Sequence, residues 1–376
     1  MKFRSIIVLV LVTVIYFSCQ KSDTSETYSF DNYDRQVLLS NLVDNILIPA
    51  YQNFYSELNE FDIAISNFQS AATSNNLQDI RIKFIEAYKL WQHVEMFNIG
   101  YAEEIFYGSK MNIYPTNVSR ISVNINSTNS DLDTNPNQYS AQGFPAIDYM
   151  LYGIAGSDQE FIELYGENSG DNPTFDYLNL IVDRMVVNTD AVMNDWLENK
   201  DNFINSTGNT SGSSLNMLAN DFIYYYEKGF RANKFGIPAG VWAGILTQNV
   251  ESFYARSLSK VLAQESLNAS KNFFLGIHYD SDINGEGLYD YIAYLDDTNY
   301  SNNSDFIGLQ DAIVESMDNS MNKINSLSDN FVNQIENDNY KMLETFDAIQ
   351  DGVVLMKTNM LSLLGISVDY FDADGD

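Results

Sequence analysis

Residues 313–331 read IVESMDNSMNKINSLSDNF, and the spacing of apolar side chains in this stretch indicates the fold class. The apolar residues recur every three or four positions, at Ile313, Met317, Met321, Ile324, Leu327 and Phe331. Side chains three and four residues apart share one face of an α-helix, whereas a strand brings alternate residues to one face. The stretch is therefore predicted to be an amphipathic helix with one buried face.

The same spacing recurs along most of the chain. Comparable apolar stripes begin near Leu38, Phe84, Leu178, Leu215 and Leu343. No stretch of similar length alternates with a period of two, so the sequence predicts an all-α protein.

A polar break at residues 166–172, rich in glycine and asparagine, divides these helices into two groups. The first group occupies residues 32–165, and the second, with an acidic C-terminal tail, occupies residues 173–376. Each group carries enough apolar stripes for its helices to bury one another's faces. We therefore expect two packed helical bundles.

The composition excludes several classes of function. The chain has 376 residues, with 51 acidic and 20 basic side chains and a formal net charge of −31. A phosphate-binding surface needs clustered Lys and Arg, which the sequence lacks, so we expect neither nucleic-acid binding nor docking on anionic lipid. The only two histidines, His93 and His278, exclude a histidine-rich zinc site and disfavour a Ser-His-Asp triad.

The N-terminus predicts an exported, lipid-anchored protein. Lys2 and Arg4 precede an apolar run that is too short to span a membrane, as expected for a signal peptide over residues 1–18. The single cysteine, Cys19, stands where a bacterial lipoprotein is cleaved and acylated, and the polar residues 19–31 are predicted to be a flexible tether. The alternative is an ordinary signal peptide with a chance cysteine.

The segment at residues 143–153 reads GFPAIDYMLYG and is the most distinctive in the chain. Gly143 and Gly153 bound an apolar run that carries Pro145 near its start and one acid, Asp148. Without a Cβ, the two glycines allow close backbone approach. From the residues alone, the simpler interpretation is a short helix whose first turns carry a favourable negative charge.

Several segments, in order along the chain, resemble the imelysin-like family. Residues 143–153 resemble the family signature G-x-H-x-x-E, and residues 91–100, 112–116, 234–238 and 251–258 resemble its other segments. The resemblance implies a cell-envelope protein of two helical bundles, often linked to iron uptake. It also implies a peptidase label that comes from an insulin-cleaving founder member.

The signature departs from the family pattern at its two metal-ligand positions. Pro145 stands at the position of the histidine and Asp148 at that of the glutamate. Proline has no lone pair for a metal, and a catalytic zinc needs about three protein ligands. Asp148 is then the one remaining metal ligand of the signature, and we expect no peptidase activity.

Any binding site is expected at the junction of the two bundles, around Asp148. Glu95, Glu251, Tyr254 and Ser257 are the candidate neighbours, the last three as a polar row at spacings of three along one helix. Clefts between packed helices are common ligand sites. The alternatives are that Asp148 caps a helix and that the row is a hydrogen-bonded seam between helices.

Other polar features have simpler explanations. His93 is predicted to lie on the surface, and His278 to be structural or exposed. Residues 280–285 match the first half of an EF-hand loop, but Tyr291 replaces the bidentate Glu, which favours a turn over a calcium site. Residues 372–376 are expected to be a solvated acidic tail.

Three functions remain as hypotheses. The first is a lipid-anchored envelope protein, at the outer membrane or on the periplasmic or surface face, that assists the acquisition of iron or another metal without catalysis. It would bind a divalent cation, iron or calcium, or a partner protein of iron uptake. The second is an imelysin-type metallopeptidase, and the third is a surface lipoprotein that binds a partner without metal.

Overall fold

The computed structural model describes residues 31–127, 131–166, 172–298 and 304–368. These ranges are predominantly helical and contain no β-sheet; Ile277 and Asn284 form an isolated bridge. The all-α prediction is confirmed. The predicted signal peptide, Cys19, nearly all of the tether and the acidic tail lie outside the described residues.

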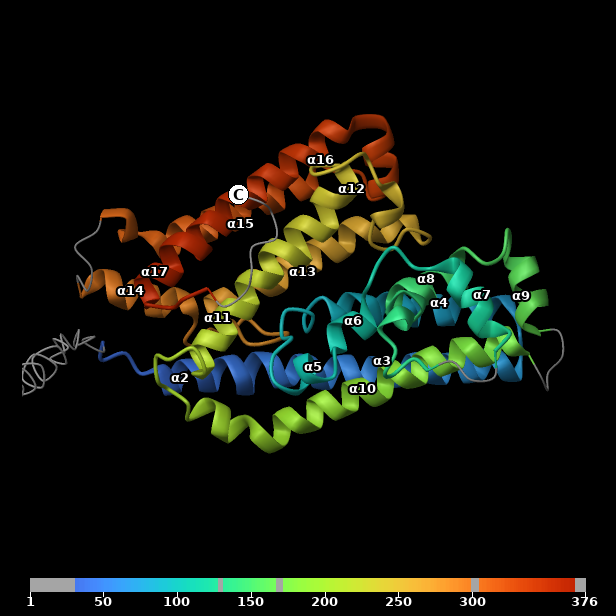
Figure 1. Cartoon of the computed structure of the whole chain (residues 1–376), viewed down its shortest axis with the longest axis horizontal. Coiled ribbons are helices and arrows are strands. Elements are labelled where there is room, and N and C mark those ends of the chain that lie inside the picture. The colour runs from blue at the N-terminus through green and yellow to red at the C-terminus, as the bar shows by residue number, and fades with distance from the viewer. Residues whose placement is uncertain (1–30, 128–130, 167–171, 299–303, 369–376) are drawn as a thin grey trace, which may run out of the picture. The chain divides into compact units, whose positions relative to one another are not determined.

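The helices that precede residue 205 pack on one another as a first group (Figure 1). They are α2 (Arg35–Ser40), η1 (Asn41–Leu47), α3 (Ile48–Ser70), α4 (Ser74–Trp91), α5 (Tyr101–Glu104), α6 (Tyr107–Met111), α7 (Val118–Ile125), η2 (Pro136–Ala141), α8 (Gly143–Tyr152), α9 (Asp158–Gly166) and α10 (Pro173–Ile204). The α4 stripe predicted from the sequence is buried, and Phe144 of α8 stacks on Tyr88 with ring centroids 4.3 Å apart. This aromatic contact fixes the signature helix against α4.

The remaining helices form a second group, in which α15 packs on α16 and α16 packs on η3. They are α11 (Ser214–Tyr224), η3 (Tyr225–Gly236), α12 (Ile237–Ala239), η4 (Thr247–Asn249), η5 (Arg256–Leu258), α13 (Ser259–Leu275), α14 (Leu288–Asp297), η6 (Ser304–Phe306), α15 (Leu309–Asn325), α16 (Phe331–Val354), η7 (Leu355–Met360) and α17 (Leu361–Leu364). Met317 and Ile324 of the opening stripe are fully buried.

The long helix α10 packs with the first group, although the sequence analysis placed residues 173–204 in the second. Its contacts with α3 and α8 bury Leu178, Ile181 and Met185. The polar break before α10 is thus a connection within the first group, because loop composition marks where a helix ends but not which neighbour the next helix packs against.

Within the part of the chain that the structure describes, three helical segments contain a π-helical stretch, namely η1, η3 and η7. Pro49 is the second residue of α3, and the helix runs through it without a break from η1. Proline has no N–H to donate to the preceding turn, so it interrupts the hydrogen bonding of a continuous helix. The π-helical stretch lies just before that interruption.

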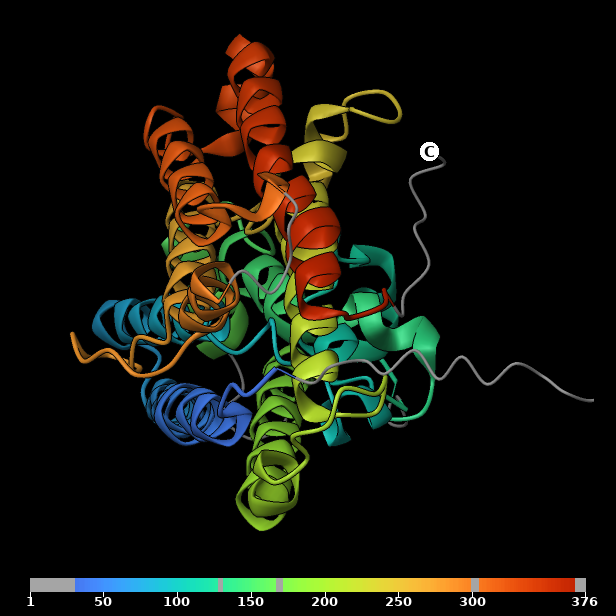
Figure 2. The same ribbon diagram turned by 90° about the vertical axis from the view of Figure 1, so that its left-hand side faces the viewer.

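The two groups meet where α13 packs on α4 and α11 packs on α2 (Figure 2). This contact brings the end of α4 close to η3 and α13, so polar side chains of both groups can meet there. Among the described helices, none is both long enough and apolar enough to cross a membrane.

Candidate functional site

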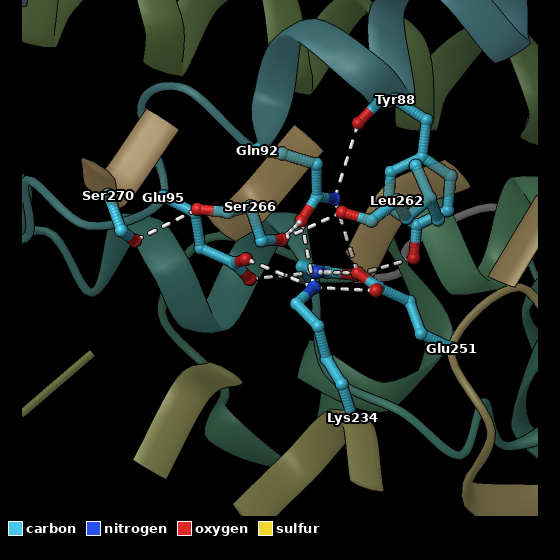
Figure 3. A network of polar contacts seen from close by, with 9 residues as sticks. Tyr88, Gln92, Glu95, Lys234, Glu251, Leu262, Ser266 and Ser270 are labelled. Atoms are coloured by element: carbon cyan, nitrogen blue, oxygen red, sulfur yellow. Dashed lines mark hydrogen bonds and ion pairs between the residues drawn. The ribbon is translucent and has the colours of Figure 1, made fainter. Parts of the chain in front are cut away.

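Five polar side chains meet in the protein interior and are named the polar cluster: Gln92, Glu95, Asn112, Lys234 and Glu251. The first two follow the end of α4, Asn112 ends α6, Lys234 belongs to η3, and Glu251 lies between η4 and η5. Figure 3 shows Gln92, Glu95 and Glu251 around the Lys234 ammonium. Both groups of helices therefore contribute to the cluster.

Lys234 is the centre of the cluster, and only 1% of its side chain is exposed. Its Nζ donates to Glu251 Oε2 at 2.5 Å and to Gln92 Oε1 at 2.8 Å. Glu95 Oε2 lies 3.6 Å from the same Nζ. One ammonium group thus faces two carboxylates in a site that excludes most water.

The two amide side chains bridge the carboxylates. Asn112 Nδ2 donates to Glu95 Oε1 at 2.8 Å and to Glu251 Oε1 at 2.9 Å. The Tyr88 hydroxyl donates to Asn112 Oδ1, which fixes the orientation of that amide. Ser266 of α13 donates to Gln92 Oε1 at 2.6 Å and thereby fixes the orientation of the Gln92 amide.

The cluster carries more negative than positive charge, and this imbalance affects Glu95. Burial raises the pKa of Glu95; the Lys234 charge opposes that shift, and the Glu251 charge adds to it. Glu95 is therefore easier to protonate than an exposed glutamate.

Asp148 lies in the middle of α8 and holds a turn of the second group. Its Oδ2 accepts from the Tyr254 N–H at 2.8 Å, and its Oδ1 accepts from the Ala255 N–H at 2.8 Å and from the Ser252 hydroxyl at 3.4 Å. Burial raises the pKa of Asp148 to about 7, although these hydrogen bonds favour the carboxylate. Asp148 does not cap its own helix, because it lies in the middle of α8. Its carboxylate instead accepts hydrogen bonds from the turn at residues 252–255.

A pocket of about 200 Å³, named the signature pocket, opens beside Asp148. Its walls include the side chains of Tyr114, Pro145, Asp148, Gln248, Phe253 and Tyr254. Burial and the charges of Glu251 and Glu95 raise the pKa of Tyr114. Tyr114 therefore lines the pocket and also interacts electrostatically with the two acids of the polar cluster. The pocket is aromatic at its walls and has one buried carboxyl.

Both glycines of the signature are close to other parts of the chain. Gly143 has a φ of +72°, and a Cβ there would lie 2.2 Å from the Met111 carbonyl oxygen. A Cβ at Gly153 would lie 2.3 Å from the Tyr254 ring. Gly153 therefore lets the signature helix support one wall of the pocket.

The structure groups four of the five candidate site residues and leaves out one. Asp148 and Tyr254 meet at the signature pocket, and Glu95 and Glu251 meet in the polar cluster. Ser257 is exposed, and its hydroxyl donates only to the Ala255 carbonyl. The expected row along one helix is wrong, because residues 251–255 form turns.

Sequence reasoning missed Lys234, Gln92 and Asn112 as members of the cluster. Lys234 offered a signal, since it directly precedes the buried apolar residue Phe235. Two acids expected in the interior also require a cation nearby. The two amides gave no comparable signal, because an Asn or Gln is common on any helix surface.

The residues at the signature do not fit a divalent metal. Both Asp148 oxygens are taken by backbone N–H groups, and Pro145 has no donor atom. Nowhere in the described ranges do three His, Cys, Asp or Glu side chains gather closely enough to hold a metal ion. In the EF-hand-like segment, Tyr291 is buried and its hydroxyl accepts from Arg35.

His93 is less exposed than expected. Its Nε2 lies 3.1 Å from Glu265 Oε2, and 21% of its side chain is exposed. The helix ends at Trp91, so a helical wheel does not describe the position of His93. His278, predicted to be structural or exposed, is half-buried in the loop after α13.

A scan against family models matches residues 47–354 to the model described as Imelysin. The chain belongs to the imelysin family. A search of curated proteins by sequence found no match.

Two solved structures share the fold. A Parabacteroides distasonis protein named as an iron-regulated protein A precursor is 16% identical, with a TM-score of 0.69 over 88% of this chain and 95% of its own. An imelysin-like protein from Psychrobacter arcticum is also 16% identical, with a TM-score of 0.67 over 89% of this chain and 97% of its own. At this identity the likeness establishes the fold.

Proposed function

We propose that this imelysin-family chain is a lipid-anchored envelope protein that serves the acquisition of iron or another metal by binding, without catalysis. The observation that carries the proposal is that both carboxylate oxygens of Asp148 accept hydrogen bonds from backbone N–H groups. The signature acid thereby becomes part of a pocket wall. A peptidase would need it free, with a second ligand in place of Pro145.

The signature pocket is the proposed binding site. Its volume of about 200 Å³ suits one side chain or a small group of a partner better than a whole drug-sized ligand. The aromatic walls of Tyr114, Phe253 and Tyr254 favour an apolar or aromatic group. The link to iron rests on family membership and on the name of the Parabacteroides relative.

Growth under iron limitation tests the binding role. Gln248 is exposed at the pocket wall and none of its side-chain atoms forms a hydrogen bond within the described chain, so Gln248→Trp should fill the pocket without removing a contact. A strain that produces this variant should grow with chelator like a deletion strain, whereas Gln248→Ala should grow like wild type. Equal growth of the deletion strain and wild type would refute the iron role.

A peptidase assay tests the absence of catalysis. We expect the full-length protein to cleave no peptide when zinc is added. Chelator-sensitive cleavage that disappears in Asp148→Ala would overturn the proposal in favour of an imelysin-type metallopeptidase.

Cell fractionation tests the anchor at Cys19. Several acyl chains hold a protein firmly in a membrane, whereas one chain holds it only marginally. Cys19→Ser should therefore move most of the protein from the membrane fraction to the soluble fraction. If the variant stays as membrane-bound as wild type, the lipoprotein assignment is wrong.

A further inference from the structure

A second, larger hollow lies on the side of α4 that faces α13. This cleft has a volume of about 580 Å³ and is named the acidic cleft. Asn53 of α3, Glu86 of α4, Glu265 of α13 and the loop residues Tyr279 to Asp282 are among its walls. The cleft shares no residue with the signature pocket, and its volume is in the range of small-molecule sites.

The walls of the acidic cleft are held in place by contacts between different elements. Asn53 Nδ2 donates to the Tyr279 hydroxyl at 2.8 Å, which joins α3 to the loop after α13. The Tyr279 ring meets the His93 ring edge to face at 5.5 Å, and His93 pairs with Glu265. The aromatic face and the acids are thus preorganised around the cleft.

The cleft continues inward into a small apolar recess. The recess has a volume of about 30 Å³ and shares His93, Asn272, Tyr279 and Asp280 with the cleft. Ile46, Met96 and Phe97 line its inner end. A ligand that enters the cleft therefore meets polar groups at the mouth and apolar carbon below.

Negative charge exceeds positive charge in the cleft. Glu86 pairs with Lys89 at 3.0 Å and Glu265 pairs with His93, so these acids are at least partly balanced. Asp280 and Asp282 make no ion pair with any side chain of the described chain. A concave surface of one sign raises the local concentration of ions of the opposite sign.

The distribution of this charge distinguishes between kinds of cation. A divalent metal requires several ligands within about 2.6 Å of one point, and the acids of the cleft are not gathered in that way. Acids spread around the cleft, on α4, α13 and the loop after α13, suit a molecule whose positive groups are separated by carbon. The Tyr279 ring adds a surface for methylene groups and for a cation above its face.

We propose that the acidic cleft binds a linear alkylamine with two or three ammonium groups. One ammonium group lies between Asp280 and Asp282, and a second lies toward Glu86 and Glu265. The methylene chain between them covers Tyr279. The ligand is a free polyamine, and the same chemistry on a lysine-bearing peptide is the alternative source.

Calorimetry of the full-length protein with spermidine tests the proposal. We expect one bound spermidine per chain, weakened by added salt because the contacts are ionic. The double variant Asp280→Asn, Asp282→Asn should bind about tenfold more weakly, since it loses two charge contacts. Asp280 has a φ of +50°, which asparagine also tolerates, so the loop should keep its fold.

A matched control separates a site from general attraction to an acidic protein. Glu198→Gln with Asp201→Asn changes the net charge equally on exposed positions of α10 and should leave the affinity unchanged. An equal loss in both double variants, or no binding by wild type at millimolar spermidine, would overturn the proposal. Tighter binding of a single-lysine peptide than of spermidine would overturn the assignment to a free amine.

Discussion

Replacing Lys234 by methionine should destabilise the protein strongly. The methionine keeps most of the side-chain volume but removes the ammonium that lies 2.5 Å from Glu251 and 3.6 Å from Glu95. Gln92 also loses one of the two donors to its carbonyl oxygen, and the Ser266 hydroxyl remains. Breaking a buried ion pair by removing one partner costs about 3–5 kcal/mol, because the other charge stays buried without compensation. We expect a loss of that size at pH 7.

The loss should depend on pH in a defined direction. Without Lys234, the pKa of Glu95 in the folded state rises further above the ordinary value of 4.5, because the opposing positive charge is gone. A carboxyl with a raised folded pKa favours the folded state at low pH, and this advantage is lost as the pH rises through the folded pKa. The deficit of the variant should therefore be largest near pH 8 and shrink toward pH 4.5.

Urea denaturation followed by circular dichroism at pH 5 and pH 8 measures this effect. The control is Lys271→Met, which breaks a surface pair with Asp318 whose side chains are 27% and 54% exposed. Exposed pairs contribute only about 0.2–1 kcal/mol. If Lys234→Met costs no more than the control, or if its deficit grows as the pH falls, the cluster is not a buried, charge-paired unit.

Three further substitutions test other parts of the structure. Asp148→Asn should cost about 1–3 kcal/mol, because an amide cannot accept from both backbone N–H groups. In the wild-type protein, the free energy of unfolding should also fall as the pH rises from about 4 to 7, because the folded-state pKa of Asp148 is raised. Melting curves of the variant should lack this pH dependence. Gly153→Ala should cost about 1–3 kcal/mol by displacing the Tyr254 ring, and an unchanged melting temperature would contradict this contact. Met317→Asp should cost several kcal/mol by placing a carboxylate on a fully buried face, and no loss would mean that the face is open to water.

The fold was predictable because local periodicity reports burial directly. Met317, Phe84 and Leu178 were placed on buried faces from their spacing, and all three are buried. The position of α10 was not predictable in this way. Its apolar stripe shows that it packs on something, but the partner is decided by long-range contacts that leave no local pattern.

The candidate site was predictable only in part. Asp148 and Glu251 were recognised as acids in segments that resemble a known family. The actual role of Asp148 depends on a turn about 100 residues away, and Lys234 meets Gln92 across 142 residues of chain. Ser257 failed for the opposite reason, because one continuous helix was read into residues 251–257, where turns at 251–255 precede the short helix η5.

The π-helical stretch η3 has a consequence for how this chain tolerates changes of length. A π-helical turn holds more residues than an α-helical turn, and each residue added to a helix rotates the later residues of that helix by about 100°. Lys234 lies near the end of η3, so its inward direction depends on the surplus residues before it. Deleting one residue between 226 and 229 would shorten the rod by only about 1.5 Å but would swing the ammonium away from both carboxylates. Related sequences should therefore tolerate substitutions in η3 far more readily than insertions or deletions.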